Sequence, residues 1–229
     1  MDYIFSNESS ASPWIENLDF NWKSLVSLGQ TIKFKKNQYV FIQDHAIDYV
    51  YIILEGRIRL VLLSTFGDEK HIVIIGKNGM VGECSLFADH TYTNSAIASS
   101  NATLVRVPVK QFQKVISHDF ALSSQVMKLT SLKFRVAAYH SLQLSFTSAN
   151  QRIANSLLQL GLAYGEKNGK RIKIAINFTH QEMAYLVGTS RVTVSNTMTQ
   201  LQHLGIISKV SGGYLIENVE ELMQFTKEI

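Results

Sequence analysis

The sequence predicts an α+β protein with a β-rich first half and a helical second half. Residues 31–108 form short runs rich in Val, Ile, Tyr and Phe, separated by glycines that indicate turns. After Pro108 the apolar residues recur every three or four positions, which is the spacing of amphipathic helices. We therefore expect an N-terminal extension over 1–30, a β-roll over 31–108, a short and a long helix over 109–148, and a helix-turn-helix unit with a hairpin over 149–229.

The composition indicates a folded protein of a reducing compartment. The chain has 229 residues, of which 46% are hydrophobic, enough for one large core or two small ones. The apolar runs are too short to span a bilayer, and the N-terminus lacks the pattern of a signal peptide. The single cysteine excludes an internal disulfide. We expect a cytoplasmic protein that does not associate with membranes.

Positive charge is concentrated in the second half of the chain. Residues 150–215 contain seven basic side chains against Glu166 and Glu182: Arg152, Lys167, Lys170, Arg171, Lys173, Arg191 and Lys209. This distribution favours a polyanionic partner, although an ordinary solvated surface remains the alternative. The histidines lack metal-ligand spacing, and no nucleophile–base pattern has a recognisable context, so we expect neither a metal or cofactor nor an enzyme.

The β-rich region reads as a jelly roll. Its strands are expected in "TIKFKKNQYVFI", "YVYIILEGRIRLVLLS", "EKHIVIIG" and "ATLVRVP", and "RIRLVL" alternates as a half-buried strand does.

A long helix is expected over 119–146, which contains neither Gly nor Pro. Apolar side chains recur along it at coiled-coil-like steps, and a second copy of the chain is the simplest partner for such a seam. The dimerisation residues would then be Leu122, Val126, Leu129, Leu132, Val136 and Tyr139. The alternative is that this stripe packs on its own roll.

The last third of the chain predicts a winged helix-turn-helix. Thr179 and Glu182 form a capping box that starts a helix, and Gly188 provides the turn. A second helix follows over 190–204, and "IISKVSGGYLIENV" reads as a two-stranded wing.

The second helix has the pattern of a DNA-reading helix. Val194, Met198 and Leu201 share the face expected to pack on the unit. The residues expected to contact double-stranded DNA are Thr179, Gln181, Ser190, Arg191, Val192, Thr193, Asn196 and Thr199. The alternative is that these small and polar residues are a solvated surface.

These motifs resemble the catabolite-activator/fumarate-nitrate-regulator (Crp/Fnr) family of bacterial transcription factors over nearly the whole chain. The resemblance rests on "DYVYIILEGRIRL", "GMVGECSLF", "RIANSLLQL" and "THQEMAYLVGTSRVTVSNTMTQLQHLGII". It implies an effector-binding β-roll of the cyclic-nucleotide-binding type, a long dimerisation helix and a winged helix-turn-helix. The chain is also similar to the halorespiration-regulator (CprK-like) branch, in Val192 and in its extended N-terminus.

Two departures from the family pattern concern the bases that are read. Many members carry Glu at the place of Val192 and Arg at the place of Asn196. Valine can contact a thymine methyl group, and asparagine can pair bidentately with adenine. We therefore expect an A·T-rich palindromic site.

The expected effector site also departs from the family pattern. In members that bind cyclic nucleotides, a Gly-Glu pair and a later Arg-Ser pair hold the ligand, and here Gly82, Glu83 and Ser95 match but Asn94 replaces the arginine. Without that cation cyclic AMP is not expected. Lys133 matches a lysine that faces a small halogenated phenolic acid in the halorespiration branch. The expected effector residues are Gly82, Glu83, Cys84, Tyr92, Asn94, Ser95, Lys133 and Phe134.

Each effector residue has a simpler interpretation. Glu83 could be a satisfied loop residue, Lys133 an exposed helix lysine, and the aromatic residues part of the core. The leading hypothesis is a homodimeric transcription regulator that is gated by a small molecule and contacts RNA polymerase. The alternative is a constitutive DNA binder, or one controlled by oxidation of an acidified Cys84 thiol, with a vestigial effector pocket.

Overall fold

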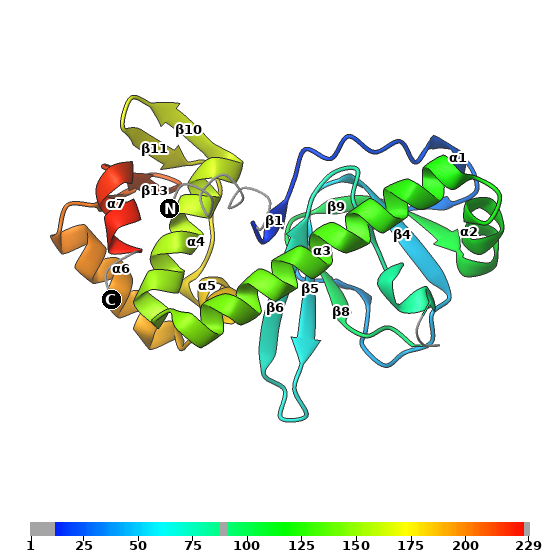
Figure 1. Ribbon diagram of the computed structural model, residues 1–229, viewed down its shortest axis with the longest axis horizontal. Coiled ribbons are helices and arrows are strands. Elements are labelled where there is room, and N and C mark those ends of the chain that lie inside the picture. Colours follow the sequence, from blue (N-terminus) through cyan, green and yellow to red (C-terminus); the bar gives the residue numbers. More distant parts are fainter. Residues whose placement is uncertain (1–11, 88–90, 227–229) are drawn as a thin grey trace. The chain divides into compact units, whose positions relative to one another are not determined.

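The computed structural model describes residues 12–87 and 91–226, so residues 1–11 of the expected N-terminal extension lie outside the described part. The chain divides into two compact units, Pro13–Ala137 and the residues from Ala138 onward. The long helix α3 (Phe120–Phe146) belongs to both units (Figure 1). The α+β architecture expected from the sequence is confirmed.

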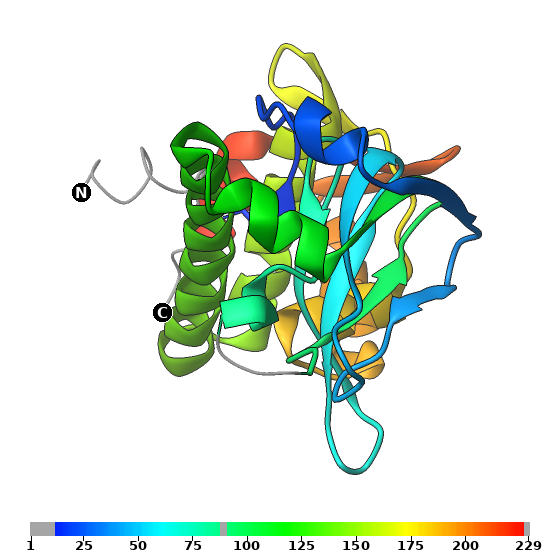
Figure 2. The ribbon, with the colours of Figure 1, turned by 90° about the vertical axis from the view of Figure 1, so that its right-hand side faces the viewer.

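The first unit is built on two β-sheets. One has the strand order β1-β6-β5-β8-β3 and the other β2-β9-β4-β7. Its strands are β1 (Trp14–Ile15), β2 (Gln30–Phe34), β3 (Tyr39–Phe41), β4 (Tyr49–Glu55), β5 (Ile58–Leu63), β6 (Glu69–Ile75), β7 (Met80–Val81), β8 (Ser95–Ala98) and β9 (Ala102–Pro108). The β5–β6 hairpin projects beyond the rest of the unit (Figure 2). Trp14 pairs with Ile74 in parallel, so part of the expected extension is a strand of the roll.

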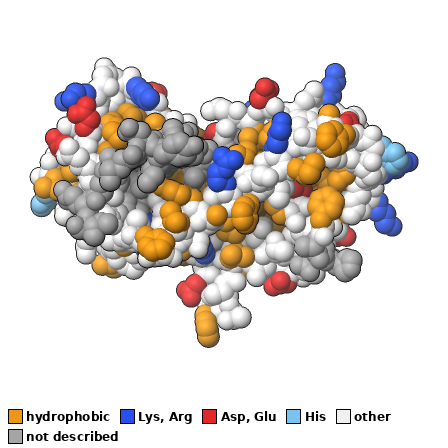
Figure 3. Space-filling model, in the orientation of Figure 1, with side chains coloured by type: hydrophobic (Ala, Val, Ile, Leu, Met, Phe, Trp, Pro, Cys, Tyr) orange, Lys and Arg blue, Asp and Glu red, His pale blue; other side chains and the backbone are white. Residues whose placement is uncertain are grey.

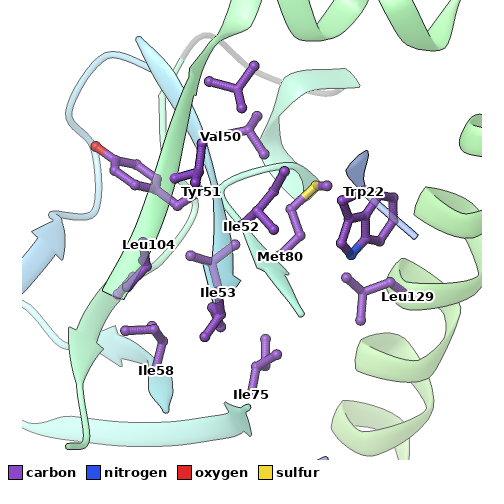
Figure 4. Close-up of a cluster of buried hydrophobic side chains, with 14 of the residues drawn as sticks. Trp22, Val50, Tyr51, Ile52, Ile53, Ile58, Ile75, Met80, Leu104 and Leu129 are labelled. Atoms are coloured by element: carbon purple, nitrogen blue, oxygen red, sulfur yellow. The ribbon is translucent and has the colours of Figure 1, made fainter. Parts of the chain in front are cut away.

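Helices cover one sheet of the first unit. They are α1 (Lys23–Val26), α2 (Val109–Ile116) and the first part of α3, and a 3₁₀ turn, η2 (Cys84–Phe87), follows β7. Ile52 pairs with Met80 across β4 and β7. The Met80 side chain points toward Trp22 and Leu129 of α3 (Figure 4). All of these side chains belong to one apolar core, so burial of α3 and of the strands is cooperative.

The apolar stripe expected to form the dimer seam instead packs on the roll. Leu122, Val126, Leu129 and Val136 are buried in the core of the first unit, and Leu132 packs against it. The alternative interpretation therefore describes the four buried residues, whose assignment to dimerisation is corrected. Leu132 is only half-buried, and its assignment stays a prediction. Tyr139 lies beyond the boundary between the units and is half-buried.

The second unit contains the expected winged helix-turn-helix. Its helices are α4 (Ala149–Tyr164), α5 (His180–Val187), α6 (Arg191–His203) and α7 (Val219–Phe225). Its strands are β10 (Gly165–Asn168), β11 (Arg171–Ile174), β12 (Ile207–Val210) and β13 (Gly213–Ile216), in the sheet order β10-β11-β13-β12. The wing β12–β13 is thus the edge of a four-stranded sheet rather than an isolated hairpin. Within the described ranges, no helix is both long and apolar enough to cross a membrane.

Candidate functional site

Helix α5 begins with the capping box that the sequence predicts. The Glu182 backbone N–H donates to Thr179 Oγ1 at 3.0 Å, and the Thr179 backbone N–H donates to Glu182 Oε2 at 2.7 Å. Two backbone N–H groups that the helix itself leaves unpaired are thereby satisfied. Gly188 ends α5 with φ +69°, a left-handed conformation that glycine adopts without a Cβ clash.

Arg152 of α4 holds the turn between α5 and α6. Its Nε donates to the Val187 carbonyl at 2.8 Å and its Nη2 to the Gly188 carbonyl at 3.2 Å, while Nη1 donates to the Thr147 carbonyl at 2.6 Å. Burial lowers the pKa of the Arg152 guanidinium. Part of the basic charge that suggested a polyanionic partner therefore fixes the geometry of the helix-turn-helix.

Helix α6 has one buried face and one exposed face, as expected. Val194, Met198 and Leu201 are buried. Val192 is 68% exposed, and the other exposed side chains of α6 that are expected to contact DNA are Arg191, Asn196 and Thr199. This exposure leaves the Val192 methyl groups accessible to a partner on the outer face of α6.

Ser190 and Thr193 are already engaged at the start of α6. Ser190 Oγ accepts from the Thr193 backbone N–H at 3.0 Å and lies 2.9 Å from Thr193 Oγ1. Their first role is therefore to cap the helix. Thr179 is exposed and Gln181 is half-buried at the start of α5.

A hollow between the wing and the start of α5 adds residues that were not predicted. It has a volume of about 350 Å³ and is lined by Thr179, which is a predicted DNA contact, and by Asn177, Phe178, His180, Lys209 and Tyr214 among others. His180 Nε2 lies 3.1 Å from the Tyr214 hydroxyl oxygen. Burial, together with Arg191 and Lys209, lowers the pKa of the His180 imidazole. The expected wing could have pointed to Lys209 and Tyr214, since both lie on its strands.

In the first unit, two of the expected effector residues form a buried ion pair. Lys133 Nζ lies 2.5 Å from Glu83 Oε1 and donates to the Met80 carbonyl at 2.8 Å. Lys133 is 6% exposed and Glu83 is fully buried. Glu83 Oε2 is also buried and has no hydrogen-bond partner among the described residues. A buried carboxylate oxygen without a donor is costly, so this atom is a candidate ligand contact.

The third member of this cluster, Cys84, is a protonated thiol. Its Sγ donates to Glu83 Oε1 at 3.1 Å and lies 3.9 Å from Lys133 Nζ. Burial raises the pKa of the Cys84 thiol to about 12, against the opposing effect of Lys133. The redox alternative depends on a Cys84 thiol whose pKa is lowered at a helix start, and this expectation is wrong. Burial lowers the pKa of Lys133, but the Glu83 carboxylate and the hydrogen bonds to Glu83 and Cys84 raise it more, so the ammonium is charged at neutral pH.

The remaining effector candidates do not all join this cluster. Ser95 Oγ is buried and accepts from the Gln43 backbone N–H at 2.9 Å, and Asn94 Nδ2 donates to Thr93 Oγ1 at 3.4 Å. Tyr92 donates to the Tyr49 carbonyl at 2.7 Å and belongs to a separate group of aromatic rings. Phe134 is 74% exposed and lies outside the buried cluster of Glu83 and Lys133, so its role in effector binding stays a prediction.

The exposed face of α3 carries a second apolar stripe. Phe120, Met127 and Phe134 are spaced by seven residues and are 82%, 54% and 74% exposed. Apolar side chains gather over α3 on the surface (Figure 3). A seven-residue repeat keeps these side chains on one side of the helix, which is the spacing of a helix–helix seam.

Comparisons with known proteins agree with this architecture. The family descriptions that match are "Cyclic nucleotide-binding domain" over residues 31–119 and "Crp-like helix-turn-helix domain" over residues 151–225. The chain is 28% identical over 193 residues to the CRP-like cAMP-activated global transcriptional regulator of Mycobacterium tuberculosis, covering 84% of this chain and 86% of that protein. It is 24% identical over 196 residues to the anaerobic regulatory protein of Bacillus subtilis, covering 85% and 82%.

Solved structures share the fold. A CprK variant with one cysteine replaced by serine, complexed with OCPA, superposes with a TM-score of 0.74 at 20% identity, covering 93% of this chain and 97% of that one. A CooA variant from Carboxydothermus hydrogenoformans gives 0.78 at 19% identity, covering 94% and 99%.

The fold and the matched domains define a transcription regulator with an effector-binding domain and a DNA-binding helix-turn-helix. The two matched domains and the relatives that span both of them identify the family. The chain belongs to the Crp/Fnr family of transcription regulators.

Proposed function

We propose that the protein is a homodimeric regulator that reads an A·T-rich palindrome through α6 and is gated by a small molecule other than cyclic AMP. The observation that carries the effector part is the buried Glu83–Lys133 pair with its unpaired Glu83 Oε2. RNA polymerase is the expected further partner of a regulator of this type.

The charges around Glu83 argue against a cyclic nucleotide. No Lys or Arg lies between Lys77 and Arg106 in the sequence, and Asn94 occupies the place of the family's phosphate-binding arginine. A cyclic phosphate would therefore enter without the arginine that pairs with it in the family. It would also have to take Lys133 from Glu83 in a buried site, at a desolvation cost of several kcal/mol.

A small phenolic acid fits the same atoms better. Its phenolate could take Lys133 from Glu83, and a hydroxyl or protonated carboxyl group could donate to a Glu83 oxygen. Because Lys133 lies on α3 and Glu83 follows β7, this exchange would loosen or re-form a link between the long helix and the roll. Gating then follows if the two arrangements differ in DNA affinity.

The base preference follows from the exposed side chains of α6. Val192 offers methyl groups to thymine and Asn196 offers a bidentate amide to adenine. The exposed apolar stripe of Phe120, Met127 and Phe134 supports pairing of two copies, and two reading helices require two half-sites.

Selection of binding sites from a random DNA duplex pool by the full-length protein tests the proposed base preference of α6. The salt concentration is held fixed because phosphate contacts make DNA affinity depend on salt. We expect enrichment of an A·T-rich palindrome. Asn196→Ala should weaken binding to the selected site by about tenfold, which corresponds to the loss of one base contact of about 1–3 kcal/mol. Gln200→Ala, at another exposed position of α6, is the matched control. A G·C-rich consensus would overturn the base assignment.

The effector part is tested separately, by titrating small halogenated phenolic acids into the protein and its selected DNA. The expected result is a change in DNA affinity that is lost in Glu83→Gln, while cyclic AMP has no effect. A response to cyclic AMP, or a phenolic acid that binds without changing DNA affinity, would contradict the proposed gating.

A further inference from the structure

The first unit contains a second hollow, separate from the Glu83–Lys133 cluster in its lining. It has a volume of about 330 Å³ and lies where β3, the following loop and β4 meet. Five of the side chains that line it are aromatic rings: Tyr39, Phe41, Tyr49, Tyr51 and Tyr92. Tyr39 is 43% exposed, so the hollow opens to solvent.

The rings of this aromatic hollow are held in place by their own contacts. Phe41 and Tyr92 are stacked with centroids 3.9 Å apart and planes inclined by 12°, and Phe41 also contacts Tyr51 at 5.9 Å. The Tyr92 hydroxyl donates to the Tyr49 carbonyl at 2.7 Å. Because these side chains are fixed before any ligand arrives, binding would require little ordering of the protein.

The aromatic hollow has an acidic residue, Asp48, in its lining and a basic residue, Arg106, outside it. Among the described residues that line it, Asp48 is the acidic one and is exposed, and His45 is the other ionisable group besides the tyrosines. Burial raises the pKa of the Tyr51 phenol, so this ring is neutral at physiological pH. Arg106 does not line the hollow, but its guanidinium carbon lies 5.0 Å from the Tyr49 ring centroid.

Arg106 is held outside the hollow by other contacts. Its Nη2 and Nε donate to Gln30 Oε1 at 2.6 and 3.2 Å. Its guanidinium also lies over the Tyr49 ring, where the negative face of an aromatic ring favours a cation. Among the described lining residues, the carboxylate available to a ligand therefore belongs to Asp48, and the most accessible ring is that of Tyr39, which is 43% exposed.

We propose that this hollow is a binding site for a small aromatic amine, with the ring of the ligand packed among the tyrosines and its ammonium group facing Asp48. Aromatic rings favour such contacts in offset or edge-to-face arrangements. The volume exceeds what one aromatic ring and a short amine need, and it lies at the lower end for small-molecule sites. The proposal does not depend on the effector assigned to Glu83 and Lys133.

The site also adjoins the turn that carries Glu83. A Cβ atom at Gly82 would lie 3.2 Å from Tyr92 Cε1 and 3.5 Å from Phe41 Cε1, so the stacked rings support this turn. An amine in the aromatic hollow would therefore contact the same rings on which the Gly82–Glu83 turn rests.

Three probes that share a phenethyl group and differ in charge test the proposal on the full-length protein. They are phenethylamine, 2-phenylethanol and 3-phenylpropionate, titrated by ligand-detected NMR at low salt. We expect phenethylamine to bind about fivefold more tightly than 2-phenylethanol, the upper range for an exposed ion pair, and 3-phenylpropionate to bind most weakly. Equal affinities of the three probes would contradict a role of Asp48 in binding the ammonium group, and with it the proposal. Tighter binding of the anion would show that Arg106 sets the charge preference, and would overturn the proposal.

Two variants locate the binding, each with a matched control. Asp48→Asn should remove the preference for the amine, and Tyr39→Ala should weaken all three probes. Asp19→Asn and Phe66→Ala alter an exposed acid and a 92% exposed ring elsewhere in the unit, and should change nothing. All four positions are exposed, so the variants should fold, and thermal unfolding verifies this. Unchanged binding in Asp48→Asn and Tyr39→Ala would place the amine elsewhere and refute the proposal.

Discussion

Lys133 on α3 and Glu83 after β7, fifty positions apart in the chain, form an ion pair at 2.5 Å inside the first unit. The lysine is 6% exposed and the glutamate is fully buried. Such a pair links a helix to a sheet edge through charge rather than through apolar packing. The net contribution of this pair to the free energy of folding is small compared with the cost of removing one partner, because the partner that remains would be an uncompensated buried charge.

The first prediction is that Lys133→Met destabilises the protein strongly. It leaves Glu83 buried without its cation, and we expect the free energy of unfolding to fall by about 3–5 kcal/mol. Adding Glu83→Gln to Lys133→Met should recover part of the loss, because a neutral amide is less costly to bury. Urea denaturation at neutral pH measures both changes.

Lys128→Met is the control for this prediction, because Lys128 is an exposed lysine on the same helix. It should change the free energy of unfolding by less than about 0.5 kcal/mol. If the single variant Lys133→Met were as stable as the control, the ion pair would not be a buried charge interaction.

Local sequence patterns predicted the parts of the second unit that depend on neighbours in the chain. The Thr179–Glu182 capping box, the turn at Gly188 and the two faces of α6 all follow from residues within a few positions of each other. Local spacing determines which side chains share a face of a helix. These predictions therefore needed no knowledge of the tertiary structure.

The parts that could not be predicted depend on which distant surface a side chain meets. Helix α3 has apolar side chains on opposite faces, one stripe including Leu122 and Val126 and the other including Met127 and Phe134. Spacing alone cannot tell which stripe meets the roll. Lys133 and Glu83 were each proposed for the effector site, but their pairing required the fold.

The second prediction concerns the exposed stripe of α3. Replacing Met127 and Phe134 together by glutamate should weaken dimerisation by at least about tenfold, because an apolar seam would have to bury two like charges. Analytical ultracentrifugation measures the dimer dissociation constant. Phe66→Glu, at a 92% exposed ring on the β5–β6 turn, should leave that constant unchanged.

The opposite face of α3 provides the contrast. Val126→Glu should unfold the first unit rather than dissociate a folded dimer, since Val126 is 4% exposed in the core. A folded monomer from Val126→Glu, with an intact dimer from the Met127 and Phe134 double variant, would reverse the assignment of the two faces.

The third prediction concerns the clamp on the helix-turn-helix. Arg152→Met removes three hydrogen bonds to the carbonyls of Thr147, Val187 and Gly188. We expect the turn to open more readily, by about 1–3 kcal/mol, because partly buried carbonyls lose their donors. Hydrogen exchange of the backbone amides over 180–200 measures this opening, and DNA affinity should fall in parallel.

Arg171→Met serves as the comparison for Arg152→Met. Arg171 pairs with Glu217 at 3.1 Å, but its side chain is 63% exposed. An exposed pair of this kind contributes about 0–1 kcal/mol, so exchange over 180–200 should be nearly unchanged. Equal effects of the two variants would mean that general loss of charge, rather than the clamp, controls the turn.

The last prediction is that DNA affinity rises as the pH falls through the range of His180. Burial, Arg191 and Lys209 hold the pKa of His180 below its ordinary value, so the imidazole is neutral in the free protein near neutral pH. A DNA phosphate in the hollow beside the wing would attract the imidazolium and raise that pKa, so binding would take up a proton. We expect affinity to increase by about threefold to tenfold between about pH 8 and pH 6.

The lowered pKa of His180 also sets the lowest pH at which this experiment can be carried out. Because the folded state holds the proton of His180 less tightly than the unfolded state, stability declines as the pH falls below the ordinary histidine value of about 6.5. Fluorescence anisotropy at fixed salt and above about pH 6 therefore measures DNA binding by folded protein. His180→Gln should flatten the pH profile, whereas His203→Gln, at an exposed position in the last turn of α6, should retain it. If both variants kept the slope, the wing hollow would not hold a DNA phosphate through His180, and Lys209 would be its remaining cation.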